Sequence, residues 1–414
     1  MRETAATTPI GVGLISVGWM GQLHSKAYRA VPMVYPELGI TTRLVQAADS
    51  SDARAAFARD VLGYATSALD YREVLANPEV DVVSICAPNF LHAEMGIAAA
   101  EAGKSFWIEK PAGRSAAETG AIAAAADAAG VVTSVGFNYR HAPAVEHAKK
   151  LIAEGSLGRI TNVRGTFFAD YSAEPHGALS WRFTRALAGS GVLGDLMGHL
   201  VDLMHYLVGP IGEVSAVTST VYTQRPVLQM GQGTHFAVIE NGELGPVENE
   251  DYSAMLVRFA DDAEGSGAVG TLEASRVAVG PRARYTFEIY GTEGSLSWNF
   301  ERMNELEVAI GRTGDHIGYT TVYASPGFGD FSRFQPGAGT AMGYDDLKVI
   351  EAKKFLVAVS GGERLNSTIH DAVAAARVVS AAEESGISRG WVAIPPTVGT
   401  TAAVREPSGV GSRA

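Results

Sequence analysis

Cysteine is almost absent from this sequence, because Cys86 is the only one in 414 residues. A single thiol cannot form an internal disulfide, so the chain is not a disulfide-stabilised secreted scaffold. No apolar run approaches the length of a membrane span, and the first residues lack the apolar core of a signal peptide. We therefore expect a cytoplasmic protein.

Positive charge is also scarce. The 33 lysines and arginines face 45 acidic residues, which gives a formal net charge of −12. This balance argues against nucleic acid or an anionic membrane as a partner. A small molecule is then the expected partner, and a locally basic pocket can still exist inside an acidic protein.

The material that is present suits two globular domains. Hydrophobic residues make up 46% of a chain that is too long for one ordinary core. Up to about residue 142, short apolar runs alternate with helical patterns, which predicts a doubly wound parallel sheet. Beyond it, successive strand patterns without intervening helices predict an α+β domain with a large, mostly antiparallel sheet. We expect four segments: a disordered start (1–8), an α/β domain (9–142), an α+β domain (143–398) and a disordered tail (399–414).

A glycine-containing turn follows the first predicted strand. Ile15 to Gly21 reads Ile-Ser-Val-Gly-Trp-Met-Gly, at a strand end and a helix start. A dinucleotide turn needs glycine for close approach of the pyrophosphate and for helix–strand packing, and Gly18 and Gly21 fill those places. Ser16 replaces the first glycine, and serine suits the turn if its φ stays negative. The backbone of Trp19 and Met20 would offer N–H groups to the phosphates.

An acidic residue ends the second predicted strand. Asp49 lies about 28 residues beyond Gly21, where a carboxylate accepts hydrogen bonds from the adenosine ribose. Its charge would repel a 2′-phosphate, which favours NAD over NADP, although Ser50 and Arg54 leave some use of NADP open. The alternative is that Asp49 only caps the next helix.

Several further motifs occur together. Ala87-Pro88-Asn89 precedes His92, and Glu109-Lys110-Pro111 follows the next strand. The segments 136–140 (Gly-Phe-Asn-Tyr-Arg) and 191–199 (Gly-Val-Leu-Gly-Asp-Leu-Met-Gly-His) come later. This combination resembles the Gfo/Idh/MocA family of oxidoreductases along nearly the whole chain. Ser180-Trp181-Arg182-Phe183 and the turn at 291–294 are most similar to members that oxidise levoglucosan and other pyranose rings, with inositol dehydrogenases next.

The resemblance implies a Rossmann domain that binds NAD and a second domain that binds a sugar or cyclitol. Many members are dimers or tetramers, so a homodimer or homotetramer is expected. The implied catalytic residues are Lys110, Asp195 and His199. The expected cofactor-binding residues are Ser16, Gly18, Trp19, Met20, Gly21, Asp49, Ser50, Ala87, Pro88, Asn89, His92, Glu109, Lys110 and Asn138. The expected substrate-binding residues are Lys110, Tyr139, Arg140, Asp170, Trp181, Arg182, Asp195, His199 and Tyr344.

These residue types suit oxidation of a secondary alcohol. Histidine has a reference pKa of about 6.5, which makes His199 the natural general base, and Asp195 lies four residues earlier on the same helix. Lys110 can hold the hydroxyl and stabilise developing negative charge on its oxygen. Asp195, His199, Asp202 and His205 also follow a helical spacing that a metal site would use. We expect no metal, because no cysteine ligand accompanies them.

The leading functional hypothesis is an NAD-dependent dehydrogenase acting on a levoglucosan-like pyranose at carbon 3. Three alternatives stay open: an inositol dehydrogenase, an NAD-dependent glycosidase, and a non-catalytic NAD-binding sensor. Retention of Lys110, Asp195 and His199 together argues against the sensor. Ala87 stands where the family usually has threonine, which removes one hydroxyl near the cofactor.

Overall fold

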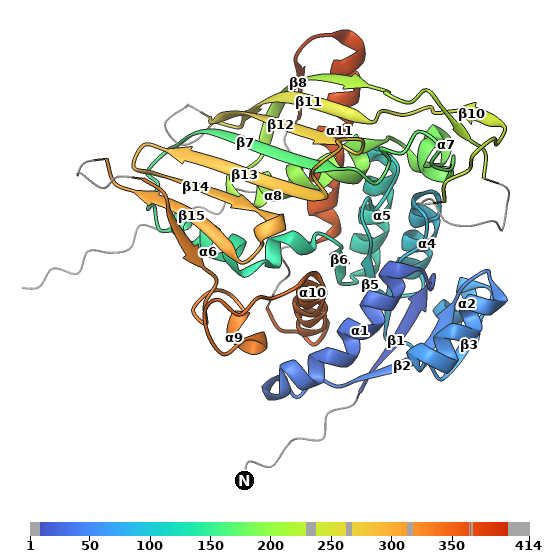
Figure 1. Ribbon diagram of the computed structural model, residues 1–414. Coiled ribbons are helices and arrows are strands. Elements are labelled where there is room, and N and C mark those ends of the chain that lie inside the picture. Colours follow the sequence, from blue (N-terminus) through green and yellow to red (C-terminus); the bar gives the residue numbers. More distant parts are fainter. Residues whose placement is uncertain are drawn as a thin grey trace, which may run out of the picture.

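Two β-sheets organise the chain, and helices connect and cover them (Figure 1). The computed structural model describes residues 9–228, 237–261, 267–312, 318–363, 365 and 367–395. The two segments predicted to be disordered, 1–8 and 399–414, lie outside the described residues. Among the residues that are described, no helix is long and apolar enough to cross a membrane.

The first sheet has six parallel strands in the order β3-β2-β1-β4-β5-β6, which confirms the doubly wound prediction. The chain leaves β1 toward β2 and β3 and then returns to β4 on its other side. Ligands of such sheets bind beyond the carboxyl ends of the strands at this switch point. The strands are β1 (Ile10–Ile15), β2 (Thr42–Ala48), β3 (Thr66–Ala68), β4 (Val82–Ile85), β5 (Ser105–Ile108) and β6 (Thr133–Val135).

Helices follow most strands of this sheet, as the alternating pattern predicts. They bury both faces of the central strands, so that β4 is buried along its whole length. The helical segments are α1 (Trp19–Val34), η1 (Pro36–Leu38), α2 (Asp52–Phe57), η2 (Ala58–Leu62), α3 (Tyr71–Ala76), α4 (Asn89–Glu101) and α5 (Ala116–Ala129).

The second sheet is larger and mixed, in the order β16-β15-β14-β13-β7-β12-β11-β8-β17. Its neighbours are antiparallel except for β7 and β12, which confirms the prediction of a mostly antiparallel sheet. The strands are β7 (Ile160–Ala169), β8 (Ile211–Ser219), β11 (Tyr252–Phe259), β12 (Val269–Ser275), β13 (Ala283–Gly291), β14 (Gly294–Asn299), β15 (Glu305–Ile310), β16 (Thr320–Tyr323) and β17 (Val392–Ala393), with a separate ribbon of β9 (Gln224–Pro226) and β10 (Leu244–Pro246).

The last two long helices tie the two halves together. Helix α10 (Tyr344–Val359) packs on α1, and α11 (Ile369–Ser388) packs on both α5 and β8 (Figure 1). The remaining helical segments are η3 (Asn138–His141), α6 (Pro143–Ala153), η4 (Trp181–Phe183), α7 (Arg185–Ala188), η5 (Leu193–Met197), α8 (Gly198–Leu207), η6 (Phe300–Arg302) and α9 (Phe331–Phe334).

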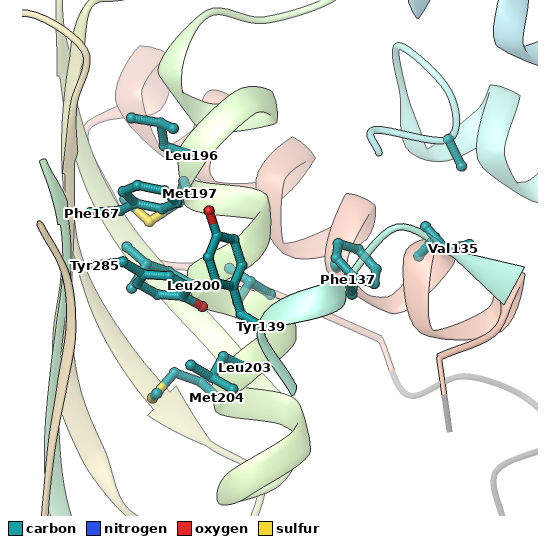
Figure 2. Close-up of a cluster of buried hydrophobic side chains, with 14 of the residues drawn as sticks. Val135, Phe137, Tyr139, Phe167, Leu196, Met197, Leu200, Leu203, Met204 and Tyr285 are labelled. Carbon is teal, nitrogen blue, oxygen red and sulfur yellow. The ribbon is translucent and has the colours of Figure 1, made fainter. Parts of the chain in front are cut away.

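A buried aromatic core lies between the second sheet and the helix η5–α8 (Figure 2). The rings of Phe167 on β7 and Tyr285 on β13 stack with centroids 4.6 Å apart, and Tyr139 meets Tyr285 edge-on at 4.8 Å. Met197 and Leu200 complete the contact from the helix side. This packing fixes the helix that carries Asp195 and His199.

The turn after β1 has an unusual backbone conformation. Ser16 has a φ of 74°, whereas a serine was expected to fit this turn only with a negative φ. The turn needs left-handed backbone at this position, and a residue with a Cβ adopts that conformation at a cost of about 1–2 kcal/mol. The departure from glycine therefore leaves strain in the turn, held by the hydrogen bond from Ser16 N to Ala48 O.

We expect Ser16→Gly to stabilise the protein by up to about 1 kcal/mol, since relief of the left-handed strain exceeds the entropy that glycine adds to the unfolded chain. Thermal unfolding of the purified protein measures this as a higher Tm. Ser16→Ala keeps the Cβ and removes only the hydroxyl, so it is the matched control and should not gain stability. A lower Tm for the glycine variant would contradict the interpretation.

Candidate active site

The turn after β1 is shaped for a phosphate group. A Cβ added at Gly18 would have no protein atom within 4 Å, so this position opens outward. A Cβ at Gly21 would lie 2.2 Å from the carbonyl oxygen of Ser16, so only glycine lets α1 start this close to the strand. Helix α1 begins at Trp19, and its first N–H groups have no partner within the helix. These features fit the pyrophosphate of a dinucleotide.

Asp49 lies at the end of β2, beside that turn. Its carboxylate accepts the backbone N–H of Val17 at 2.9 Å and that of Ser51 at 3.0 Å. Ser51, not Asp49, is the N-cap of α2. Each carboxylate oxygen retains a lone pair for a ribose hydroxyl, so the predicted role of Asp49 is compatible with its surroundings.

The segment Ala87-Pro88-Asn89 leads from β4 into α4, which begins at Asn89. The side-chain amide of Asn89 donates to the carbonyl of Ala188 at 3.3 Å. His92 lies one turn into the same helix and is 1% exposed. Its Nδ1 is 2.7 Å from the carbonyl oxygen of Pro111, and its Nε2 is 2.7 Å from that of Ala87. The ring thus bridges the Ala87 and Lys110 turns, and its predicted part in cofactor binding stays a prediction.

Glu109 also supports the site from the protein interior. Its carboxylate is 7% exposed and contacts Lys348 Nζ at 2.6 Å and His24 Nε2 at 3.0 Å. Both of those partners lie in the protein interior, so the carboxylate anchors the turn from within. The predicted part of Glu109 in cofactor binding stays a prediction. The next peptide bond, Lys110–Pro111, is cis.

Lys110 and Asp195 meet although they come from different halves of the chain. Lys110 Nζ donates to Oδ1 of Asp195 at 2.8 Å and to the backbone oxygen of Asp195 at 2.8 Å. The hydroxyl of Tyr171 donates to the other carboxylate oxygen of Asp195 at 2.5 Å. Burial alone would raise the pKa of Asp195, but the charges of Lys110 and Arg182 and these hydrogen bonds hold it well below its usual range. Asp195 is therefore a carboxylate at neutral pH.

His199 lies one turn beyond Asp195 in a layer of aromatic rings. It is 5% exposed, and the rings of Tyr139 and Phe137 approach it edge-on at 4.9 and 5.9 Å. Burial, reinforced by the charge of Lys110, lowers the pKa of His199 well below its usual range. The imidazole is therefore uncharged at neutral pH and can accept a proton.

The other side of the site is formed by Tyr139, Asn138, Tyr344 and Trp19. In Figure 2 the Tyr139 ring stands against the helix, with its hydroxyl pointing toward Leu196. The Tyr344 ring stacks on Trp19 with centroids 5.9 Å apart. Asn138 is 1% exposed, and its side-chain amide lies within hydrogen-bond reach of the Tyr344 hydroxyl. The predicted part of Asn138 in cofactor binding stays a prediction.

Trp181 and Arg182 lie on η4, and the guanidinium of Arg182 is 4.3 Å from the centre of the Trp181 ring. The segment that carries them is supported by the ring of Phe183, which was not among the predicted site residues. Phe183 lies between the guanidinium groups of Arg225 and Arg276, each 4.6 Å from its centre. The predicted sugar-facing pair is thus presented by a supported loop.

Two predicted substrate residues are engaged elsewhere. Arg140 is 3% exposed, and its guanidinium binds the carboxylates of Asp202 and Asp371. These ion pairs engage the guanidinium inside the protein, and its predicted contact with substrate stays a prediction. Asp170 forms an ion pair with Arg282, whose side chain is 82% exposed, so Asp170 lies near the protein surface.

A metal site formed by Asp195, His199, Asp202 and His205 is not supported by the contacts of these residues. Asp202 binds Arg140, and His205 Nε2 accepts the backbone N–H of Ile211 at 3.3 Å. Among the described residues, no group of three or more His, Cys, Asp or Glu side chains is arranged to hold a metal ion.

Tyr171 is the main site residue missing from the sequence-based selection. Its segment has no regular periodicity, so the sequence gives no direction for its side chain. Only its position next to Asp170, in an irregular stretch rich in aromatic residues, pointed to the site.

Comparison with known proteins agrees with this geometry. Residues 10–137 match the oxidoreductase family model for an NAD-binding Rossmann fold, and residues 145–297 match the GFO/IDH/MocA C-terminal domain. The levoglucosan dehydrogenase of Pseudarthrobacter phenanthrenivorans is 41% identical over 93% of this chain and 98% of its own length. The chain belongs to the Gfo/Idh/MocA oxidoreductase family.

Two further relatives show how wide the likeness is. A solved levoglucosan dehydrogenase in complex with NADH and levoglucosan has a TM-score of 0.86 and 39% identity, covering 94% of this chain and all of the other. The inositol 2-dehydrogenase of Rhizobium meliloti is 26% identical over 92% of this chain and 98% of its own. The NAD-binding domain of this family therefore spans residues 10–137, which include the glycine turn after β1 and Asp49.

The state of His199 gives a pH prediction for this family member. A base that must be neutral loses activity as the pH falls through its pKa, so kcat/KM should stay level down to well below pH 6.5. Lys110→Met removes the nearby positive charge, and the remaining activity should then decline at a higher pH. The exposed Lys26→Met is the charge-matched control. An acid limb at or above pH 6.5 in the unaltered enzyme would contradict the assignment.

Proposed function

We propose that this protein is an NAD-dependent dehydrogenase that oxidises a secondary hydroxyl of a pyranose sugar, with a levoglucosan-like ring oxidised at carbon 3 as the leading substrate. The observation that carries the proposal is the cluster in which Lys110 and Tyr171 hold Asp195 as a carboxylate beside uncharged His199. This cluster supplies a hydrogen-bond donor and a proton acceptor at one place, as alcohol oxidation requires.

Lys110 has one hydrogen bond to spare. An ammonium group has three N–H donors, and two of them point to the carboxylate and the backbone oxygen of Asp195. The third is available for the substrate oxygen, where it stabilises negative charge as the proton leaves. Asp195 thus orients Lys110 as a charged donor.

His199 takes the proton of the substrate hydroxyl in this proposal. A charged Lys110 cannot accept it, and the two carboxylate oxygens of Asp195 already accept hydrogen bonds from Lys110 and Tyr171. A neutral imidazole remains, close enough to Lys110 for the ammonium charge to act on its pKa. Bound NAD⁺ supplies the acceptor for the hydride.

The preference for a sugar ring is supported by the stacked Trp181 and Arg182. An aromatic ring packs on the C–H face of a pyranose, and a guanidinium binds pairs of hydroxyls through its fixed donors. Similarity to levoglucosan dehydrogenases, one of them solved with levoglucosan, points the same way. Inositol-type rings are the second candidate because inositol dehydrogenases are also among the relatives.

The proposed cofactor preference is NAD over NADP. A 2′-phosphate would lie beside the carboxylate of Asp49, which already accepts two backbone N–H groups and is 8% exposed. The negative charges of the phosphate and of Asp49 would repel each other strongly, because little water reaches this carboxylate.

The deciding experiment is NADH absorbance at 340 nm with NAD⁺ or NADP⁺ and a panel of levoglucosan, glucose, methyl glucosides, inositols and sugar phosphates. We expect an increase with NAD⁺ and a pyranose, and a decrease in kcat of about 10²–10⁴-fold in His199→Ala. His370→Ala, on an exposed histidine, is the control.

Other outcomes identify the alternatives. Loss of a glycoside without net NADH would indicate the glycosidase. NADH formed only from inositols would make the cyclitol the substrate. NAD binding without turnover of any compound on the panel would overturn the dehydrogenase and favour the sensor.

We also propose that the protein works in the cytoplasm as a homodimer or homotetramer assembled through the second sheet. Val217, Leu256 and Val269 are 59%, 51% and 44% exposed. The pairing of β8, β11 and β12 places them on the same face of the sheet, away from the buried core. Adjacent exposed apolar side chains of this kind mark association surfaces.

Light scattering after size-exclusion chromatography tests the assembly. We expect a mass of two or four chains for the unaltered protein and a shift to smaller species in Leu256→Arg, because the charge would be buried without a partner. Val61→Arg changes an equally exposed residue on the other domain and should have no effect. A monomeric unaltered protein would refute the proposal.

A further inference from the structure

A hollow lies outside the catalytic cluster, between η6 and the segment that leads into α10. Its volume is about 330 Å³, in the range of small-molecule pockets. Phe300, Arg302, Met303, Glu305, Tyr323 and Tyr344 supply side chains to its walls.

The walls of this hollow are held in place by hydrogen bonds. The side chain of Asn304 donates to the backbone oxygen of Met342 at 3.0 Å and accepts its N–H at 3.0 Å. The N–H of Ala324 donates to the backbone oxygen of Asn304 at 2.7 Å. The η6 turn, the strand β16 and the segment before α10 are thus joined around one residue, and the hollow is pre-formed.

Its chemistry suits a neutral polyhydroxyl ring. Tyr323 is 53% exposed, which leaves its ring free to stack on C–H groups. Arg302 and Glu305 form an ion pair at 2.5 Å at the edge and can bind hydroxyls as donors and acceptors. Glu301 and Glu305 outnumber Arg302, so the hollow does not favour a phosphate or another anion.

The hollow and the catalytic cluster share one aromatic wall. The Phe300 ring is 4.9 Å from that of Tyr139, and Tyr139 is 4.9 Å from the His199 ring. Tyr344 lines the hollow and also packs edge-on against Phe300 at 6.2 Å. Two aromatic side chains therefore separate an occupant of the hollow from His199.

We propose that this hollow is a second saccharide subsite that binds a neutral pyranose ring. The inference deepens the proposed function, on which its choice of ligand rests. The ring comes either from the distal unit of a longer glycoside or from a separate sugar molecule, and the chemistry of recognition is the same for both.

Fluorine NMR of the enzyme with NADH bound, labelled with 3-fluorotyrosine, tests the proposal by a readout other than activity. The Tyr323 signal is identified by its loss in Tyr323→Phe, and Tyr319 gives a nearby exposed control that does not line the hollow. We expect levoglucosan or cellobiose to shift the Tyr323 signal saturably and to leave that of Tyr319 unchanged. Glucose 6-phosphate should not shift it.

Ala341→Trp places a large side chain in the hollow and should abolish the shift. Ala341 is exposed and lines the hollow, and it makes no contact with the catalytic cluster among the described residues, so NADH formation from a single-ring substrate should persist. A Tyr323 shift that survives in Ala341→Trp, or no shift with any neutral sugar up to its solubility, would overturn the subsite.

The two sources of the ring give different results, and each supports the subsite. If cellobiose alone shifts Tyr323 and excess levoglucosan reverses the shift, the ring is the distal unit of a bound glycoside. If levoglucosan shifts Tyr323 by itself, the ring is a separate molecule. The absorbance panel reports the proposed function independently, so a Tyr323 shift without NADH formation would refute the dehydrogenase and leave the subsite standing.

Discussion

The buried charge of Glu109 is the constraint on which the active site depends. Its carboxylate is neutralised by Lys348 from α10 and receives a hydrogen bond from His24 of α1. Burial lowers the pKa of His24 to about 4, so its ring is neutral, and it donates through Nε2 while Nδ1 accepts from Ser84. Removing one partner of such a buried pair typically costs about 3–5 kcal/mol. The residue after Glu109 is Lys110, so this ion pair joins α10 to the turn after β5 that carries Lys110.

The second half of the chain brings its own carboxylate to hold the opposite side of the site. Glu250 is 5% exposed and accepts the N–H groups of Gly191 at 2.7 Å and Leu193 at 3.0 Å. These are orphan donors at the start of the helical segment that carries Asp195 and His199. A buried acid thus anchors each of the two backbones that meet at the Lys110–Asp195 contact.

Much of this arrangement was accessible from the sequence because it depends on local patterns. Alternating strands and helices predict the parallel sheet, and motifs at strand ends predict which residues gather at the switch point. Arg140 and Tyr171 show where that reasoning stops. Arg140 belongs to a family motif, yet its partners Asp202 and Asp371 are 62 and 231 residues away. Tyr171 lies in an irregular segment, so its contact with Asp195 follows only from the tertiary packing of that segment. The φ of Ser16 is likewise set by the close approach of α1 and not by the serine itself.

The charge states of the three central groups restrict what the site can do. Lys110 as an ammonium and Asp195 as a carboxylate form an ion pair whose two charges cancel. In the proposed mechanism, a substrate hydroxyl beside this pair meets a donor in Lys110 and an acceptor in neutral His199. When the proton moves, one positive charge appears on an imidazole that burial disfavours as a cation, and Asp195 lies close enough to act against that penalty. The Asp195 carboxylate therefore has two roles in the proposed mechanism. It fixes the direction of the Lys110 donor, and it lowers the free-energy cost of a protonated His199 among the aromatic rings. Replacing Asp195 by a neutral residue would remove both effects together, which is why geometry and electrostatics cannot be separated at this position.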